Sequence, residues 1–164
     1  MGDHMAYGGF WIRVVAYFID SIILLVLLGV LYFALTAVGL VDLTAISALV
    51  DESSMQPGAE PSPALVMEMS RQMGILYLGV FLLAWLYDAL LTSSPMQATP
   101  GKMVFGLRVA TADGEPIGFG RATGRFFGKI VSGMIFNVGY LMVAFTSRKQ
   151  GLHDMIANTV VVHA

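Results

Sequence analysis

The sequence has no cysteine among its 164 residues, and it has few charged residues of either sign. The absence of cysteine excludes disulfides, thiol catalysis and zinc sites built from thiolates. Charged residues make up 12% of the chain, about half of the roughly 25% typical of soluble domains, whereas 57% of the residues are hydrophobic. This composition is typical of a membrane protein. A net charge of −2 disfavours a general nucleic-acid binder.

Two long apolar segments predict membrane-spanning helices, at residues 11–36 and 63–92. At ~1.5 Å per residue, each is long enough to cross the ~30 Å hydrocarbon core of a bilayer. No small-residue cleavage site follows the first segment, so we expect it to be retained. Residues 1–5, MGDHM, are interpreted as a cloning remnant, which leaves one membrane domain over residues 6–164.

A third, less regular apolar segment follows near the C-terminal end. Residues 120–147 are predicted to contain an interfacial helix and a third membrane segment, with the tail at 148–164. The apolar stretch 130–145 would extend only ~24 Å as a helix, and glycine and asparagine interrupt it. Residues 130–145 therefore either form a short span in a thinned bilayer or re-enter as part of a helical hairpin. The predicted fold is all-α, with two full spans, this kinked or re-entrant segment and a small β-hairpin.

The connections between these segments differ in charge, which predicts the orientation. Residues 37–62 are acidic, whereas the loop and hairpin at 93–119, with the helix that follows, are basic. Basic residues near membrane segments favour the cytosolic side, so we expect the acidic loop outside and a cytosolic N-terminus in a bacterial inner membrane. The hairpin is predicted from alternating apolar residues at 103–119 around the turn sequence ADGEP.

Two stripes interleave in the sequence GFGRATGRFFGKIV at residues 118–131. Glycines recur every fourth residue, and basic residues recur one position later, so both form lines along a helix. The glycine line permits close helix packing, and the basic line suits anionic lipid headgroups. The glycines are Gly120, Gly124 and Gly128, and the basic residues are Arg121, Arg125 and Lys129.

Charged residues also occur inside the predicted spans, where they are costly unless paired, protonated or hydrated. Arg13 and Asp20 are seven residues apart and share a helix face, but ~10 Å along the axis is too far for a direct bond. Asp88 lies near the end of the second span, at a similar expected depth to Asp20. These acids either form salt bridges that fix helix pairing or provide a cation or proton site.

Three stretches of the chain resemble the RDD family of bacterial membrane proteins: GGFWIRVVAYFIDSIIL (8–24), SSPMQATPGKMVFGLRVATADGEPIGFGRATGR (93–125) and RKQGLHDMIANTVVV (148–162). The family is named for one arginine and two aspartates, which the resemblance assigns to Arg13, Asp20 and Asp154. Asp88 matches no family motif. Arg13 and Asp154 can meet only if the tail returns to the cytosolic side, which favours the re-entrant arrangement.

The resemblance implies transport, and some family members are described as sodium/proton antiporters. The predicted function is therefore exchange of Na⁺ or K⁺ for protons at Asp20, with Arg13 and Asp154 tuning its pKa. The alternative is a non-transporting scaffold or regulatory partner whose charges only fix helix packing. Two full spans and one partial span are few to surround a transport pathway, so we expect a homo-oligomer in the lipid bilayer.

Enzymatic activity is not predicted, because no nucleophile elbow or catalytic triad is present. No cofactor is expected, since the glycine-containing stretches lack the spacing of nucleotide-binding motifs. Met67, Met69 and Met73 could bind Cu(I) through their thioethers. Methionines in such an apolar chain are more often packing residues.

Overall fold

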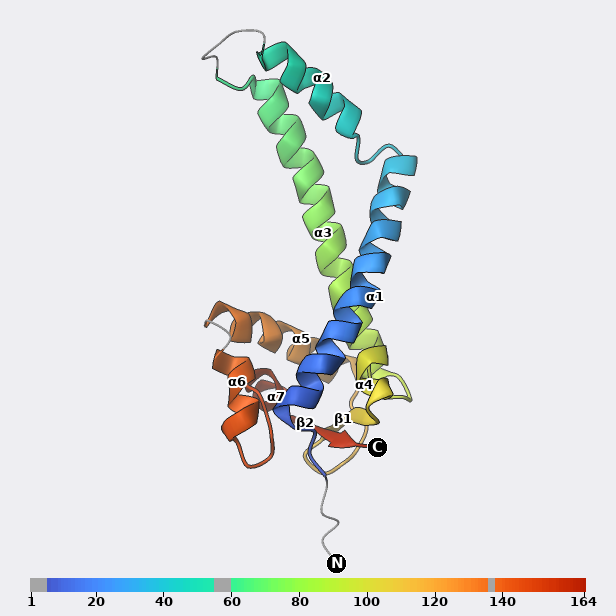
Figure 1. Cartoon of the computed structure of the whole chain (residues 1–164), viewed down its shortest axis with the longest axis vertical. Helices are drawn as coiled ribbons and strands as arrows, with labels where there is room; N and C mark the ends of the chain where they lie inside the picture. The colour runs from blue at the N-terminus through green and yellow to red at the C-terminus, as the bar shows by residue number, and fades with distance from the viewer. Residues whose placement is uncertain (1–5, 55–59, 136–137) are drawn as a thin grey trace, which may run out of the picture. The chain divides into compact units, whose positions relative to one another are not determined.

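The computed structural model describes residues 6–54, 60–135 and 138–164, and the predicted cloning remnant at 1–5 lies outside them. The chain forms two compact units, and α1 and α3 contribute to both. One unit contains the residues up to Leu24 together with Ala84–Ala164, and the other contains Leu25–Leu83. Helices dominate, with a single small sheet among the described residues (Figure 1).

The two predicted spans are confirmed as continuous helices, α1 (Phe10–Ala37) and α3 (Pro63–Ser93). Each is long and apolar enough to cross a membrane. Apolar side chains are exposed along both helices, as is usual for side chains that face lipid. Helix α3 begins at a Ser-Pro pair, where Ser62 Oγ accepts the backbone N–H of Leu65 at 3.2 Å and proline takes the first helical position.

The connection predicted as a loop at 37–62 contains a helix that the sequence reading missed, α2 (Leu43–Ser54). Asp42 caps its start, because Asp42 Oδ1 accepts the backbone N–H of Thr44 at 2.9 Å and the Thr44 hydroxyl at 2.6 Å. Gln72 on α3 exchanges two hydrogen bonds with the backbone of Asp42. These contacts fix the start of α2 against α3 within the second unit.

The small sheet pairs distant parts of the chain, so its pairing differs from the predicted hairpin. Strand β1 (Leu107–Thr111) pairs antiparallel with β2 (Thr159–His163) near the C-terminus. The predicted turn exists, with Gly114 at φ +86°, but the returning segment makes only one bridge, between Ala110 and Pro116. Proline cannot donate to a ladder, and α5 begins shortly afterwards, so a second hairpin strand does not form.

The sheet also connects the two ends of the chain. The backbone N–H of Gly8 donates to Val161 O at 2.9 Å, and that of His163 donates to Ala6 O at 2.9 Å. Leu107 and Val161 are buried in a small core that is completed by residues of α3 and α5. The residues that lead into α1 are therefore joined to the tail.

The remaining elements of this unit are α4 (Pro100–Val104), α5 (Phe119–Met134), α6 (Val138–Phe145) and α7 (Leu152–Ile156). Helices α5 and α6 are bent by 103° at their break, and together they are apolar enough for one broken span or a re-entrant loop. The predicted kinked third segment is thus confirmed as a bent helix pair. Asn137, one of the residues predicted to interrupt it, lies outside the described residues.

The small core predicts a stability difference between two leucines. Leu107 is 1% exposed in the core, whereas Leu25 on α1 is 70% exposed. We expect Leu107→Ala to lower the free energy of unfolding by ~2–5 kcal/mol, because it leaves a cavity, and Leu25→Ala to change it little. Unfolding of both variants by chemical denaturant in detergent tests this. Equal losses would show that the sheet does not form the core.

Candidate functional site

A cavity of about 610 Å³ lies within the unit that contains the two ends of the chain. Helices α1, α3, α5, α6 and α7 line it, together with α4 and the residue before it. An unusual number of ionisable side chains face one space in so apolar a protein. They are Arg13, Asp20, Asp88, Lys102, Arg125, Lys129 and His153.

Asp154 lies behind this lining and binds two arginines. Its Oδ2 is 2.6 Å from Nη1 of Arg13, and its Oδ1 is 2.8 Å from Nε of Arg125. Asp154 is completely buried. Burial alone would raise the pKa of this carboxyl group, but Arg125, His153 and Arg13 offset that effect and hold the pKa below its ordinary value. A charged Asp154 therefore joins α1, α5 and α7.

Arg13 is fixed by further bonds that involve no other charged group. Its Nη2 donates to the carbonyl oxygen of Lys149 at 2.6 Å, and its Nε donates to that of Gly8 at 2.9 Å. The expected distance between Arg13 and Asp20 is consistent with the structure, where no ion pair joins them. The pairing of Arg13 with Asp154 shows that the tail returns to the start of α1.

His153 lies beside this pair and remains neutral. Its Nε2 is 3.5 Å from Oδ1 of Asp154, and its ring is tilted against Tyr140, with centroids 5.0 Å apart. Burial is the main reason why the pKa of His153 is lowered to about 3. Asp154 opposes this shift, and the nearby basic groups add to it.

Asp20 accepts three hydrogen bonds from neutral donors. Its Oδ2 is 2.6 Å from the Thr99 hydroxyl, and its Oδ1 is 2.9 Å from the Tyr87 hydroxyl and 2.8 Å from the backbone N–H of Gly101. Asp20 is buried, and it forms no ion pair with any described residue. A Cβ atom at Gly101 would lie 2.1 Å from the carbonyl oxygen of Ala16, so glycine permits this close approach of α4 to α1.

Asp88 is the acceptor in a second charged cluster. Its Oδ1 is 2.6 Å from Nζ of Lys129 and 3.9 Å from Nζ of Lys102. Lys102 Nζ also donates to the Thr99 hydroxyl at 3.3 Å, which connects this cluster to Asp20. The pKa of Lys102 is lowered to about 7, mainly by burial and also by Arg125 and Lys129, against the opposing effect of Asp88 and Asp20.

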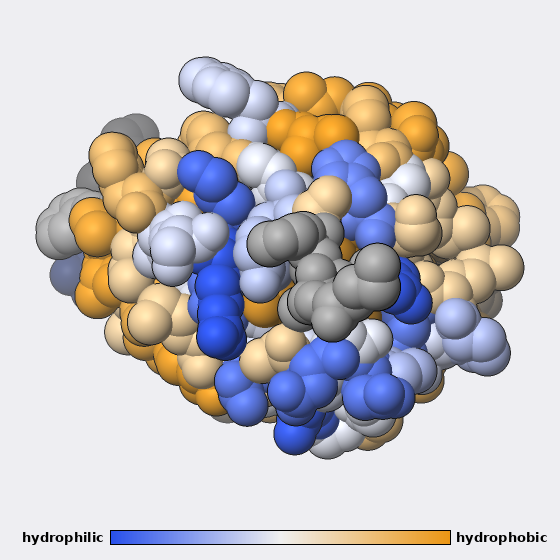
Figure 2. Space-filling view, turned by 90° about the horizontal axis from the view of Figure 1, so that it is seen from below, coloured by the Kyte–Doolittle hydropathy of each residue, from blue (hydrophilic) through white to orange (hydrophobic). Residues whose placement is uncertain are grey.

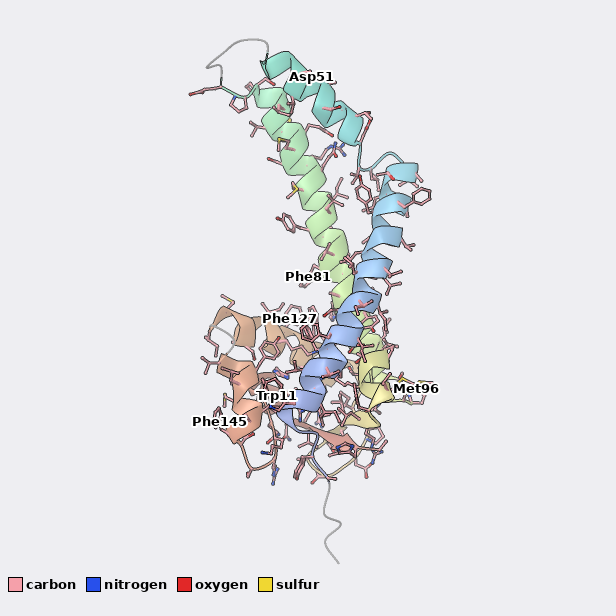
Figure 3. The ribbon with its side chains drawn as sticks, in the orientation of Figure 1. Trp11, Asp51, Phe81, Met96, Phe127 and Phe145 are labelled. Carbon is pink, nitrogen blue, oxygen red and sulfur yellow. The ribbon has the colours of Figure 1, made fainter. Side chains whose placement is uncertain are left out.

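The basic stripe of α5 is turned in the opposite direction to the prediction. Arg125 and Lys129 point toward Asp154 and Asp88, and only Arg121 is exposed. Phe127 and Ile130 on the same helix are 46% and 41% exposed. In an apolar surrounding, the favourable arrangement buries paired charges and exposes hydrocarbon. Side chains such as Phe145 project outward in the same way (Figure 3).

The glycine stripe is also only partly used for packing. A Cβ atom at Gly128 would lie 3.0 Å from the Cα of His153, so this glycine permits contact between α5 and α7. At Gly120 and Gly124, such a Cβ would have no atom of another described element within 4 Å. Gly139, which was not in the predicted stripe, is needed instead, because its Cβ would lie 2.6 Å from Oγ of Ser132.

Lys102, Thr99 and Tyr87 are site residues that the sequence reading missed. In the sequence, Lys102 is one of the basic residues of the connection expected in the cytosol, and no motif marks the hydroxyl groups of Thr99 and Tyr87. Among the described residues, no group of three or more His, Asp or Glu side chains could hold a metal ion. The three predicted copper ligands lie on α3 in the other unit.

The sequence model of the RDD family matches residues 7–158. The chain belongs to the RDD family. It is similar to two proteins of Bacillus subtilis strain 168. It is 38% identical to uncharacterized protein YxaI over 95% of this chain and 97% of the relative. It is 32% identical to uncharacterized membrane protein YteJ over 96% of this chain and 82% of the relative. No solved structure matches the chain.

This RDD protein is a membrane protein with two or three spans. The three residues that give the family its name occupy two places in it. Arg13 and Asp154 form one ion pair, and Asp20 holds the start of α4. The pairing of Arg13 with Asp154 agrees with the arrangement expected for a returning tail.

The arginine-bound aspartate predicts a large stability effect. Asp154→Asn leaves two buried guanidinium groups without their counter-charge, so we expect the free energy of unfolding to fall by ~3–5 kcal/mol. Asp113→Asn in the exposed turn is the matched control and should cost little. Denaturant unfolding in detergent measures both. A similar small cost for the two variants would contradict the structural role of Asp154.

Neutral, buried His153 predicts acid sensitivity. The unfolded chain takes up a proton at this histidine below its ordinary pKa of 6.5, whereas the folded chain does so only near pH 3. Stability from this group is therefore complete above pH ~6.5 and decreases as the pH falls toward 3. We expect His153→Gln to flatten that decrease, and His163→Gln at the exposed end of β2 to leave it unchanged. Unfolding in detergent between pH 8 and pH 4 tests this, and identical slopes for all three proteins would contradict it.

Proposed function

We propose that this RDD family protein transports ions across the bacterial cell membrane and exchanges a monovalent cation for a proton at Asp20. The observation that supports the proposal most directly is the set of groups around this carboxylate. Asp20 is buried, lines a cavity and has only neutral hydrogen-bond partners among the described residues. A carboxylate without a fixed counter-charge inside a membrane protein can bind either a proton or a cation.

The atoms around Asp20 suit both ligands. The hydroxyl oxygens of Thr99 and Tyr87 lie within 3 Å of its carboxylate, so hard cations such as Na⁺ or K⁺ would find several oxygen ligands there. Lys102, which donates to the same Thr99 hydroxyl, has a pKa of about 7 and can exchange protons near neutral pH. A proton could therefore pass between Lys102 and Asp20 through Thr99.

The orientation and assembly in the proposal follow from the sequence. The excess of basic residues after α3 favours a cytosolic position for that segment and for the N-terminus, with the connection that contains α2 outside. Two or three spans per chain are few to surround a transport pathway, so a homo-oligomer is proposed. The proposed role requires no catalytic residue and no cofactor.

A scaffold or regulatory protein is the second candidate, and one observation favours it. Asp88 and Asp154 are both engaged in ion pairs, as expected for charges that only fix packing. Such a protein would carry the same buried clusters without any flux. The two candidates differ in what Asp20 does, because Asp20 is outside these ion pairs.

Asp20→Asn separates the two candidates. Asparagine keeps an oxygen to accept from Gly101 and Tyr87, and its amide can donate to the Thr99 hydroxyl. We therefore expect a stability loss of only ~1–2 kcal/mol, since charged hydrogen bonds become neutral ones. Cation-driven proton flux in proteoliposomes should be abolished, because the group no longer exchanges protons.

The flux measurement uses Na⁺, K⁺ and Li⁺ gradients with a pH-sensitive dye inside the vesicles. Asp113→Asn is the matched control and should retain wild-type flux. Wild-type protein without flux for any of the three ions, or a folded Asp20→Asn variant with full flux, would refute exchange at Asp20.

A further inference from the structure

The charged clusters around the cavity contain more basic groups than acidic ones. Asp154 is shared by two arginines, and Asp88 is shared by two lysines. The Asp154 cluster thus carries one positive charge in excess, and the Asp88 cluster carries another when Lys102 is protonated, whereas Asp20 can balance only one of the two. An uncompensated positive charge in an apolar surrounding is costly, so an anion bound there would be stabilised.

Arg125 offers a direct contact for such an anion. Its side chain is 2% exposed and lines the cavity, yet its Nη1 has no hydrogen-bond partner among the described residues. Its Nε is already used by Asp154. A guanidinium group with a free donor suits a phosphate or carboxylate oxygen. Lys102 and Lys129 line the same cavity, and an anion would also favour the charged form of Lys102, which burial disfavours.

The size and walls of the cavity indicate what kind of anion fits. A volume of about 610 Å³ is far larger than an inorganic ion needs, and it lies within the range of pockets for organic ligands. Apolar side chains surround the charged part of the lining, including Phe126, Ile130 and Leu141. Such walls suit a hydrocarbon group next to an acidic head.

We infer that this cavity binds an amphipathic organic anion, with its phosphate or carboxylate head on Lys102, Arg125 and Lys129 and its apolar part against Phe126, Ile130 and Leu141. The anion site shares the cavity and Lys102 with the proposed exchange at Asp20, but binding of the anion does not require transport. A membrane phospholipid and a soluble amphiphile such as an alkyl phosphate share this chemistry. Hydrophilic and apolar surfaces also adjoin on the outer face seen in Figure 2.

Binding is tested with the full chain purified in an uncharged detergent. We expect radiolabelled monododecyl phosphate to bind saturably and to raise the melting temperature. Inorganic phosphate, which lacks the chain, and dodecyltrimethylammonium, which has the opposite charge, should do neither. Phosphatidylglycerol that displaces the label, where phosphatidylcholine does not, would assign the site to a lipid. Saturable binding without displacement would assign it to a soluble amphiphile.

Two pairs of variants locate the site. Lys129→Gln should weaken binding of monododecyl phosphate at least tenfold, whereas Arg121→Gln, the same kind of change on the exposed face of α5, should not. Lys102→Gln should weaken binding of monododecyl phosphate similarly. It is the second choice if Lys129→Gln fails to fold, because Lys102 is 3.9 Å from Asp88, farther than Lys129 at 2.6 Å, and its loss should disturb the fold less. Ile130→Gln in the wall should weaken binding more than Val131→Gln, its neighbour outside the lining.

The inference fails if the wild-type protein does not bind monododecyl phosphate. It also fails if inorganic phosphate binds as tightly, since the apolar walls would then contribute nothing. Equal affinity of the lining variants and their matched controls would place the bound amphiphile elsewhere on the protein. Because these are binding measurements in detergent, they succeed or fail separately from the flux experiment on Asp20.

Discussion

The buried carboxylate of Asp154 between Arg13 and Arg125 is the interaction on which the rest of this unit depends. It connects the first turn of α1 to the middle of α5 and to α7 near the end of the chain. Strand pairing between β1 and β2 adds a second connection between the middle and the tail. Together these contacts hold the helices around the cavity. Backbone hydrogen bonds of Gly8 with Val161 and of His163 with Ala6 add to the attachment of the tail beside the start of α1.

The distribution of charge in this unit follows from its surroundings. Acidic and basic groups are buried against each other, whereas aromatic and aliphatic residues of α5 and α6 face outward. Burying charges is acceptable only where each carboxylate has good partners. Two carboxylates each hold two bases, and Asp20 holds only neutral donors. This imbalance underlies both proposals, exchange of a proton or a cation at Asp20 and binding of an anion by the surplus basic groups.

The sequence predicted the parts of the structure that depend on local pattern. Both long helices begin and end within one residue of their predicted bounds, because apolar length defines a span and the Ser62-Pro63 pair marks the start of α3. The family resemblance identified Arg13 and Asp154, and the structure joins them. The partner of β1 was missed, because β2 lies some fifty residues away and strand pairing at that distance leaves no local pattern. Helix α2 was missed although its cap at Asp42 is a local signal, because the acidic residues of this stretch were interpreted as a loop.

The direction of the basic stripe on α5 was predicted wrongly for a related reason. Periodicity shows that Arg125 and Lys129 share a face of the helix, but it does not show what the face meets. The answer depends on Asp88 and Asp154, which come from other parts of the chain. Lys102 was overlooked as a site residue for the same reason, since its partners are Asp88 and Thr99.

The central claim is that the two ends of the chain lie together on one side of the membrane. Ala6 O accepts the backbone N–H of His163, so cysteines placed at Ala6 and at Ala164 must share a compartment. Since the chain has no native cysteine, each single-cysteine variant can be labelled with an impermeant thiol reagent in intact cells and in inverted membrane vesicles. The account predicts that both positions label only in inverted vesicles. Labelling of the two positions from opposite sides would contradict it.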